Sequence, residues 1–340
     1  MATVPQVTTA VIGAGAWGTA LAALLAANGQ STRLWGRNAE QMAQMEATAA
    51  TRYLPGVVLP RTLMISSDLA AVLNGVQDLL LVVPSHAFRQ TLELIAPHIQ
   101  PHIQPQRRLL WASKGFEPGS GRLLHQIVED QFGDRFPMAV ISGPTFALEV
   151  AKGMPTAITV ASRDQTLAIE VAQRLHNDRF RAYTSADVVG VEIGGAVKNI
   201  LAIAAGIADG LGFGANARAA LITRGLSEVM RLGEALGGHR ETLMGLAGLG
   251  DLVLTCTDDQ SRNRRFGLAL GRGSDMATAR ATINQVVEGI EAAKEARRLA
   301  QTLNIEMPIT EQVYQVLYNN LSPREAVTHL LTREQKSECR

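Results

Sequence analysis

A glycine-rich turn near the N-terminus constrains the fold of this chain more than any other feature. The apolar run Thr9–Ile12 leads into Gly13-Ala14-Gly15-Ala16-Trp17-Gly18, and a helix-compatible segment follows to Ala27. The first glycine permits a tight turn, the second lets the backbone approach a pyrophosphate, and the third lets helix and strand pack closely. The pyrophosphate would lie at the helix N-terminus, where free N–H groups favour negative charge. This context favours a dinucleotide site over a purely structural glycine turn, the alternative in a chain with 31 glycines.

Short apolar runs recur through the first half of the chain and predict strands. They are Thr9–Ile12, Thr32–Trp35, Leu63–Ile65, Leu79–Val83, Leu109–Trp111, Met138–Ile141 and Ala157–Val160. Helix-compatible stretches such as Trp17–Ala27, Gln90–Ile95 and Arg122–Asp130 lie between most of them. This alternation indicates βαβ units and a mainly parallel, doubly wound sheet.

The pattern changes near Val188, beyond which the sequence shows helical periodicity and no convincing strand. Helices are expected at Val188–Ala208, Arg218–Gly233, Val286–Leu303 and Thr310–Asn319. No Pro- or Ser-rich linker separates the two patterns, so one helix is expected to enter the second domain directly. We predict a Rossmann-type α/β dinucleotide-binding domain at residues 1–189 and an all-α substrate and catalytic domain at residues 190–340.

Composition and charge argue against several classes of partner. A net charge of +1 gives no global reason to expect nucleic acid or an anionic membrane surface. Cys256 and Cys339 cannot form a disulfide framework, so a reducing cytoplasm is expected. The apolar stretch Ala10–Asn28 lacks the basic flank of a signal peptide, and Ala196–Ala208 is short and contains a lysine. We therefore expect no targeting or transmembrane element.

The residue after the second predicted strand bears on the choice of cofactor. An NAD-specific site usually has an acidic residue about 20 positions past the glycines to bind the ribose 2′-hydroxyl. The segment Trp35-Gly36-Arg37-Asn38 has no acid and has an arginine instead. A guanidinium suits a 2′-phosphate, so NADP(H) is favoured, with NAD(H) tolerated. The alternative is a solvated surface arginine.

Polar residues follow several predicted strands at the edge of the sheet where ligands bind. Lys114 comes after Leu109–Trp111, and a cation there can hold an anionic substrate or polarise a carbonyl. An ordinary surface lysine is the competing interpretation. His86 follows Leu79–Val83 and is equally ambiguous, so we do not assign it as a catalytic acid.

A second lysine lies in a segment that is otherwise almost entirely apolar or glycine. Residues 190–208 contain only Glu192 and Lys198 as charges, with Asn199 beside the lysine. A helix that is apolar on every face is buried, and burial moves the pKa of a lysine down towards neutrality. Lys198 is therefore a candidate general acid or base, although a lysine that reaches the surface is the alternative.

Two further groups of polar residues follow in the second half. If a helix starts near Gly250, Asp251 and Thr255 share one face, and Asp251 can pair with Lys198. The run Ser261-Arg262-Asn263-Arg264-Arg265 then places three arginines within four residues. Such a run is usually a solvated face, but with Ser and Asn donors it is also a plausible clamp for a phosphate.

Several sequence blocks, in the correct order, resemble the bacterial NAD(P)-dependent glycerol-3-phosphate dehydrogenases. They are Gly13–Gly18, Val82–His86, Ala112–Gly115, Ile141–Phe146, Gly194–Asn199, Gly210–Asn216, Gly248–Asp251 and Ser261–Phe266. The resemblance spans nearly the whole chain and is far more specific than the glycine turn alone. It implies reversible reduction of dihydroxyacetone phosphate to sn-glycerol 3-phosphate, which supplies glycerophospholipid biosynthesis.

The resemblance also implies roles for individual residues. Lys198 would be the proton donor or acceptor, and Lys114 and Asp251 would be catalytic beside it. The substrate-binding set would be Lys114, Gly143, Thr145, Lys198, Asn199, Asp251, Thr255, Ser261, Arg262 and Asn263. The cofactor-binding set would be Gly13, Gly15, Ala16, Trp17, Gly18, Arg37, Lys114, Ala147, Arg262, Val286 and Glu288. The family often has Ser at position 16, so Ala16 removes one hydroxyl contact but leaves the backbone cradle.

The same resemblance implies a homodimer that acts on a small phosphorylated substrate and needs no metal. One alternative is a related two-domain reductase of another keto acid or phosphorylated ketone, although the arginine run argues for a phosphate. The other alternative is a non-enzymatic NADP sensor, against which Lys114 and Lys198 both weigh.

Overall fold

The computed structural model describes residues 8–99, 107–134, 136–283 and 285–334. Its first half is an eight-stranded sheet in the order β3-β2-β1-β4-β5-β6-β7-β8. The strands are β1 (Thr9–Ile12), β2 (Thr32–Trp35), β3 (Met64–Ser66), β4 (Asp78–Leu81), β5 (Arg108–Trp111), β6 (Met138–Ser142), β7 (Thr156–Ala161) and β8 (Phe180–Ser185). Neighbouring strands are parallel except at β6–β7, which pair antiparallel.

Helices cover both faces of this sheet, as a doubly wound fold requires. The helices that pack on one face are α1 (Ala16–Ala27), α2 (Ala39–Thr48), α6 (Ala147–Ala151) and α7 (Gln165–Leu175). Those on the other face are α3 (Leu69–Leu73), α4 (Phe88–Ile99) and α5 (Leu124–Phe132), with the short 3₁₀ turn η1 (Ser85–Ala87) before α4. Successive residues of β4 alternate between the two apolar cores, Leu80 facing one and Leu79 and Leu81 the other. The predicted Rossmann-type fold is therefore confirmed.

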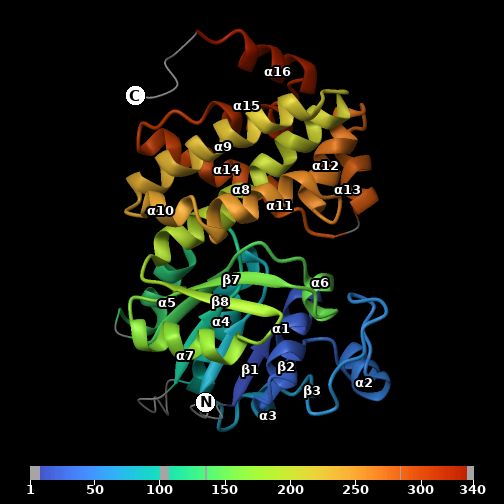
Figure 1. The fold of residues 1–340 in the computed structure, drawn as a ribbon, viewed down its shortest axis with the longest axis vertical. Helices are drawn as coiled ribbons and strands as arrows, with labels where there is room; N and C mark the ends of the chain where they lie inside the picture. The colour runs from blue at the N-terminus through green and yellow to red at the C-terminus, as the bar shows by residue number, and fades with distance from the viewer. Residues whose placement is uncertain (1–7, 100–106, 135, 284, 335–340) are drawn as a thin grey trace.

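The second half of the chain is helical, as predicted, and lies above the sheet in Figure 1. Its long helices are α8 (Val188–Gly210), α9 (Ala215–Ala235), α12 (Arg262–Gly271), α14 (Glu288–Thr302) and α15 (Pro308–Tyr318). The shorter ones are α10 (Arg240–Leu243), the π-helical turn η3 (Leu246–Gly250), α11 (Asp251–Thr257), α13 (Met276–Ile283) and α16 (Pro323–Leu331).

Helix α8 joins the two halves directly. Its side chains Val188 and Val191 belong to an apolar core of the sheet, whereas Ile193 and most later residues belong to the helical core. By length and composition α8 could cross a bilayer, but 94% of its most apolar window is buried inside the protein. Such burial is what the core helix of a two-domain fold requires.

Helices α8 and α12 lie in unusually close contact. A Cβ atom at Gly206 would lie 2.1 Å from the carbonyl oxygen of Arg264, and one at Gly267 would lie 2.1 Å from that of Ile203. Real side chains cannot approach that closely, so glycine at these positions lets the two backbones touch. This contact fixes the distance between the residues that the two helices carry.

Several expected boundaries are corrected by the structure. Strand β8 was not expected; it is an edge strand in which only Phe180 is buried, and it lacks an apolar run. Strand β4 covers Asp78–Leu81, whereas Leu79–Val83 was expected. The helices expected from Arg122 and Val286 begin at Leu124 and Glu288, after residues in extended conformation. The division between residues 189 and 190 stays a prediction.

Candidate active site

The glycine turn has the geometry that a pyrophosphate needs. Gly13 has a φ of +122°, and a Cβ at Gly18 would lie 1.9 Å from the Gly13 carbonyl oxygen, so helix α1 packs directly on the turn. Gly15 precedes α1, no side chain caps that helix, and a Cβ at Gly15 would meet nothing within 4 Å. The N-terminus of α1 therefore stays open to an anion, and this cradle fits the diphosphate of NAD(P).

The centre of the site is one carboxylate shared by two lysines. Asp251 lies at the start of α11, and its Oδ1 is 2.5 Å from the Nζ of Lys198 on α8. Its Oδ2 is 2.6 Å from the Nζ of Lys114, which follows β5. Asp251 and Lys198 are buried, and Lys114 is partly buried. The predicted pairing of Asp251 with Lys198 is confirmed, and the structure adds Lys114 to it.

Neighbouring oxygens orient both ammonium groups. Lys198 donates to the hydroxyl oxygen of Thr255 at 3.0 Å, and Thr255 donates to the main-chain oxygen of Asp251 at 2.6 Å. Lys114 donates to the main-chain oxygen of Gly143 at 3.2 Å. Because α11 starts at Asp251, its residues 251 and 255 share one face, and both point at Lys198.

The electrostatics of this cluster favour proton transfer by Lys198. Burial disfavours the charged ammonium and lowers the pKa of Lys198 from 10.5 to about 8, although Asp251 acts in the opposite direction. Burial also opposes ionisation of Asp251, but the charges of Lys114 and Lys198 outweigh it and hold the pKa of this carboxyl below its usual value. The carboxylate thus stays ionised while Lys198 titrates near neutral pH.

A chain of amide hydrogen bonds adjoins the lysine. Asn263 donates from Nδ2 to Oδ1 of Asn199 at 2.9 Å, and Asn199 donates to the carboxylate of Glu288 at 3.3 Å. The main-chain N–H of Gly289 donates to Oδ1 of Asn263 at 2.9 Å. Residues of α8, α12 and the start of α14, which are far apart in sequence, are therefore held together beside Lys198.

The arginine run does not form one clamp, contrary to the sequence-based interpretation of it as a unit. Ser261 caps α12 by accepting from the N–H of Arg264 at 3.2 Å, and Arg262 is the first helical residue. Within the described residues Arg262 has no hydrogen bond or ion pair of its side chain, and Arg265 is exposed. Arg264 is buried and bound to Asp209, because residue 264 faces α8. Arg262 lies at the helix start between Ser261 and Asn263, where its side chain is available to a ligand.

Comparison with known proteins shows to which protein family this chain is related. A model of the NAD-dependent glycerol-3-phosphate dehydrogenase N-terminus matches residues 8–168, and one of the C-terminus of the same family matches residues 187–328. A "Glycerol-3-phosphate dehydrogenase [NAD(P)+]" of Thioalkalivibrio sulfidiphilus is 58% identical over 330 residues, 97% of this chain and 98% of that protein.

The chain belongs to the NAD-dependent glycerol-3-phosphate dehydrogenase family. A second relative with the same name, from Vibrio cholerae, is 53% identical and covers 96% of this chain and 95% of its own. The crystal structure of glycerol-3-phosphate dehydrogenase from Coxiella burnetii superposes with a TM-score of 0.90 at 51% identity, covering 96% of this chain and 99% of that one. The family expected from the sequence motifs is confirmed.

The remaining residues implied by the family resemblance lie in or beside several different elements. Thr145 donates to the carbonyl of Gly143 at 3.2 Å, and Ala147 begins α6 two residues later. Ala16 and Trp17 form the half-buried first turn of α1. Arg37 and Val286 are exposed, and in the described part of the chain no hydrogen bond joins them to the lysine–aspartate cluster. His86 is exposed in η1.

The structure also shows polar groups that sequence reasoning missed. Glu192, a charge noted in the buried helix, accepts hydrogen bonds from the indole N–H of Trp111 and the main-chain N–H of His125. Asp209 binds Arg264 at 2.6 Å and Arg218 at 2.9 Å. The sequence signal for these contacts was a carboxylate near either end of the long apolar helix α8. An unpaired charge there would be costly, so each carboxylate needs a partner.

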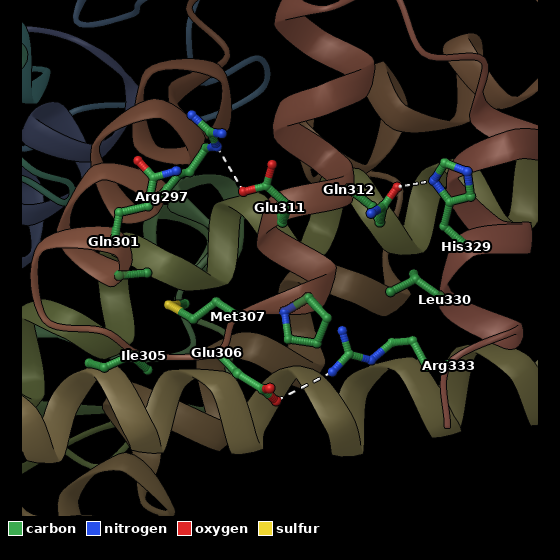
Figure 2. Close-up of a pocket in the computed structure, with 12 residues that line it drawn as sticks. Arg297, Gln301, Ile305, Glu306, Met307, Glu311, Gln312, His329, Leu330 and Arg333 are labelled. Carbon is green, nitrogen blue, oxygen red and sulfur yellow. Dashed lines mark hydrogen bonds and ion pairs between the residues drawn. The ribbon is translucent and has the colours of Figure 1, made fainter. Parts of the chain in front are cut away.

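A pocket of about 240 Å³ lies away from this site, between α14, α15 and α16. Figure 2 shows its charged side chains joined in pairs, Arg297 with Glu311 and Arg333 with Glu306. None of the residues implied by the family resemblance lines it. It is therefore not the site at which the lysine–aspartate cluster acts.

Proposed function

We propose that this chain catalyses the reversible NAD(P)H-dependent reduction of dihydroxyacetone phosphate to sn-glycerol 3-phosphate, with Lys198 as proton donor and acceptor. The observation that carries the proposal is the buried Lys198, 2.5 Å from Asp251, with a pKa lowered to about 8. A group with a pKa close to the working pH is suited to both directions of a reversible reaction. The product is a glycerophospholipid precursor, and we infer that the enzyme supplies that pathway.

The bound cofactor supplies the hydride, and the residues of the chain handle charge and protons. In reduction, protonated Lys198 donates its proton to the oxygen of the reacting carbonyl as negative charge develops there. Lys114 provides a second cation that stabilises this charge. Asp251 holds both ammonium groups in place, and Thr255 fixes the direction in which Lys198 points. In oxidation, neutral Lys198 takes the proton from the alcohol.

The other end of the substrate would bind at the start of α12. We define the phosphate clamp as Ser261, Arg262 and Asn263. The guanidinium of Arg262 has no partner within the described residues, and it lies at a helix N-terminus, where the dipole favours an anion. Binding a phosphate far from the reacting carbon supplies energy and fixes orientation.

A direct assay tests the proposed reaction. Initial rates of NADPH oxidation are measured with dihydroxyacetone phosphate, with unphosphorylated dihydroxyacetone and with ketopantoate. We expect rapid turnover of the phosphorylated ketone and little of the other two, because only it engages the phosphate clamp. A rate with dihydroxyacetone phosphate no higher than background would refute the proposal, and turnover of ketopantoate instead would favour the related reductases.

The pH dependence of the reaction follows from the pKa of Lys198. Reduction requires the protonated ammonium, so kcat/KM for dihydroxyacetone phosphate is expected to fall as the pH rises through about 8. Oxidation requires the neutral amine, so kcat/KM for glycerol 3-phosphate is expected to rise through the same range. Measuring both profiles between pH 6 and 10 at about 0.15 M salt checks the sign. Profiles that change in the same direction would contradict proton transfer by this lysine.

Arg37 is proposed to bind the 2′-phosphate of NADPH. Replacing Arg37 by alanine is expected to raise the KM for NADPH roughly ten- to hundredfold, the effect of losing one charge-assisted hydrogen bond, and to leave the KM for NADH within about twofold. Arg324→Ala, which removes an exposed arginine on α16, is the matched control. An equal loss for both cofactors would remove the 2′-phosphate role.

The place of action and the assembly are also proposals. We infer a cytoplasmic homodimer with domains at residues 1–189 and 190–340, on the basis of the family resemblance and the two cysteines, of which Cys256 is buried. Light scattering coupled to gel filtration, at protein concentrations that span the assay range, distinguishes a dimer from a monomer.

A further inference from the structure

Arg264 is buried although it belongs to a run of arginines, and its guanidinium is held at several points. Its Nη2 lies 2.6 Å from Oδ2 of Asp209, and its Nε donates to the main-chain oxygen of Cys256 at 3.1 Å. Its Nη1 pairs with Asp259. Only 8% of the residue is exposed. These contacts engage all three guanidinium nitrogens of a buried side chain, so we expect any functional effect of Arg264 to act through other residues.

The partners of Arg264 belong to the segments that carry the reacting residues. Asp209 lies on α8, the helix of Lys198. Cys256 lies on α11 next to Thr255, which accepts a hydrogen bond from Lys198. Arg264 itself lies in the first turn of α12, immediately after the phosphate clamp. One guanidinium thus joins the proton-transfer end of the site to the phosphate end.

The same carboxylate extends this connection to a neighbouring loop. Asp209 also binds Arg218 on α9 at 2.9 Å, so both ends of the α8–α9 connection are tied to Arg264 through one side chain. The backbone contacts at Gly206 and Gly267 fix the separation of α8 and α12, and the contact at Gly206 is with the main-chain carbonyl of Arg264 itself. At the start of α12, the side chain of Arg264 adds an ion pair with Asp209 to the hydrogen bond between Asn263 and Asn199, which also joins α12 to α8.

We propose that Arg264 is a positioning residue that sets the place of the phosphate clamp relative to Lys198, and so the affinity for the substrate's phosphate. The proposal rests on the proposed role of Ser261, Arg262 and Asn263 as that clamp. A guanidinium has donors in a fixed planar fork, whereas a lysine has a single ammonium. Lysine at position 264 can keep the charge but not contacts to Asp209, Asp259 and the Cys256 carbonyl together.

The experiment compares Arg264→Lys with Arg272→Lys, the matched control at the exposed end of the same helix. For each variant, kcat and KM are measured with dihydroxyacetone phosphate, kcat/KM with unphosphorylated dihydroxyacetone, and Ki with inorganic phosphate as a competitive inhibitor. We expect Arg264→Lys to raise KM and the phosphate Ki roughly ten- to hundredfold. The kcat and the rate with dihydroxyacetone should stay within about twofold of wild type, and Arg272→Lys should change nothing.

A merely structural role predicts a different outcome. Equal losses with dihydroxyacetone phosphate and dihydroxyacetone, or an unchanged phosphate Ki, would overturn the proposal. If Arg264→Lys does not fold, Asp259→Asn provides the test, because its side chain is 70% exposed and only one contact of Arg264 is lost. It should raise KM and the phosphate Ki in the same direction by a smaller factor, and no change in either would also overturn the proposal.

Arg262→Ala separates this inference from the function on which it rests. If that variant discriminates between the phosphorylated and unphosphorylated ketone as well as wild type does, the phosphate clamp itself is wrong. If Arg262→Ala no longer discriminates between the two ketones but Arg264→Lys keeps a normal phosphate Ki, the phosphate clamp is supported. Only the proposed role of Arg264 is then wrong.

Discussion

Replacing Lys198 by methionine is expected to lower kcat for dihydroxyacetone phosphate by about 100- to 10,000-fold, the range that general acid–base catalysis contributes. Methionine is unbranched and of similar length, so it fills the space on α8 without a proton to give. Asp251 keeps Lys114 as a partner at 2.6 Å, so the buried carboxylate is not left unpaired. The glycine turn lies elsewhere, and the Kd for NADPH, measured by fluorescence titration, should stay within about threefold.

The control for this variant is Lys294→Met, which removes an exposed lysine from α14. It should keep full activity in both directions. The residual activity of Lys198→Met should also lose the change of rate near pH 8 that wild type shows, because the titrating group is gone. Substantial turnover with an unchanged pH profile would assign the proton transfer to another group, with Lys114 the nearest ammonium.

Most of the sheet could be predicted from the sequence because its central strands are buried on both faces and appear as unbroken apolar runs. All residues of β1, β4 and β5 are buried. Strand β8 could not be predicted, since only the first of its residues is buried and its side chains alternate poorly. Its place depends on pairing with β7 rather than on its own composition.

The reacting end of the site could be predicted only in part. A buried ammonium needs a counter-charge, and Asp251 was predicted to supply it because it follows a glycine-rich turn and shares a helical face with Thr255. The second partner of Asp251 was not predicted, because Lys114 is 137 residues away in the sequence. It reaches Asp251 because its side chain runs past Gly195 of α8, the helix against which α11 packs.

The arginine run shows a different limit of sequence reasoning. Which arginine faces solvent depends on where α12 begins, and that is set by the Ser261 cap. A start at Arg262 turns Arg264 towards α8 and leaves Arg262 at the open helix end. A start shifted by one residue would rotate each side chain by about 100° about the helix axis, and Arg264 would no longer face α8. The resemblance to the family placed the substrate role on Arg262, a role that geometry supports and the proposed experiments test.

Replacing Asp251 by asparagine is expected to destabilise the protein by about 3–5 kcal/mol near pH 7, because two ammonium groups then lack their buried counter-charge. Asparagine has nearly the same shape as aspartate and can occupy the same helix start, so the loss of stability is attributed to the missing negative charge. The pKa of Lys198 should fall further below about 8, since the carboxylate that opposes the effect of burial is gone. We also expect kcat/KM for reduction to fall by roughly 100-fold or more, because less of the proton donor remains.

The pH dependence of this loss has a definite sign. A buried lysine whose pKa lies below its unfolded value binds fewer protons in the folded state than in the unfolded state, so stability rises with pH between the two values. In Asp251→Asn this window opens at a lower pH, so the deficit relative to wild type should shrink as the pH rises towards about 8 and level off above it, where Lys198 is neutral in both folded proteins. Urea unfolding at pH 6.5, 8 and 9.5 measures this difference in the free energy of unfolding. Asp178→Asn, which changes an exposed aspartate, is the control. If the deficit in the free energy of unfolding stays constant or grows between pH 6.5 and 8, asparagine destabilises the site through packing. Asp251 would then not be the counter-charge that keeps Lys198 ready for proton transfer.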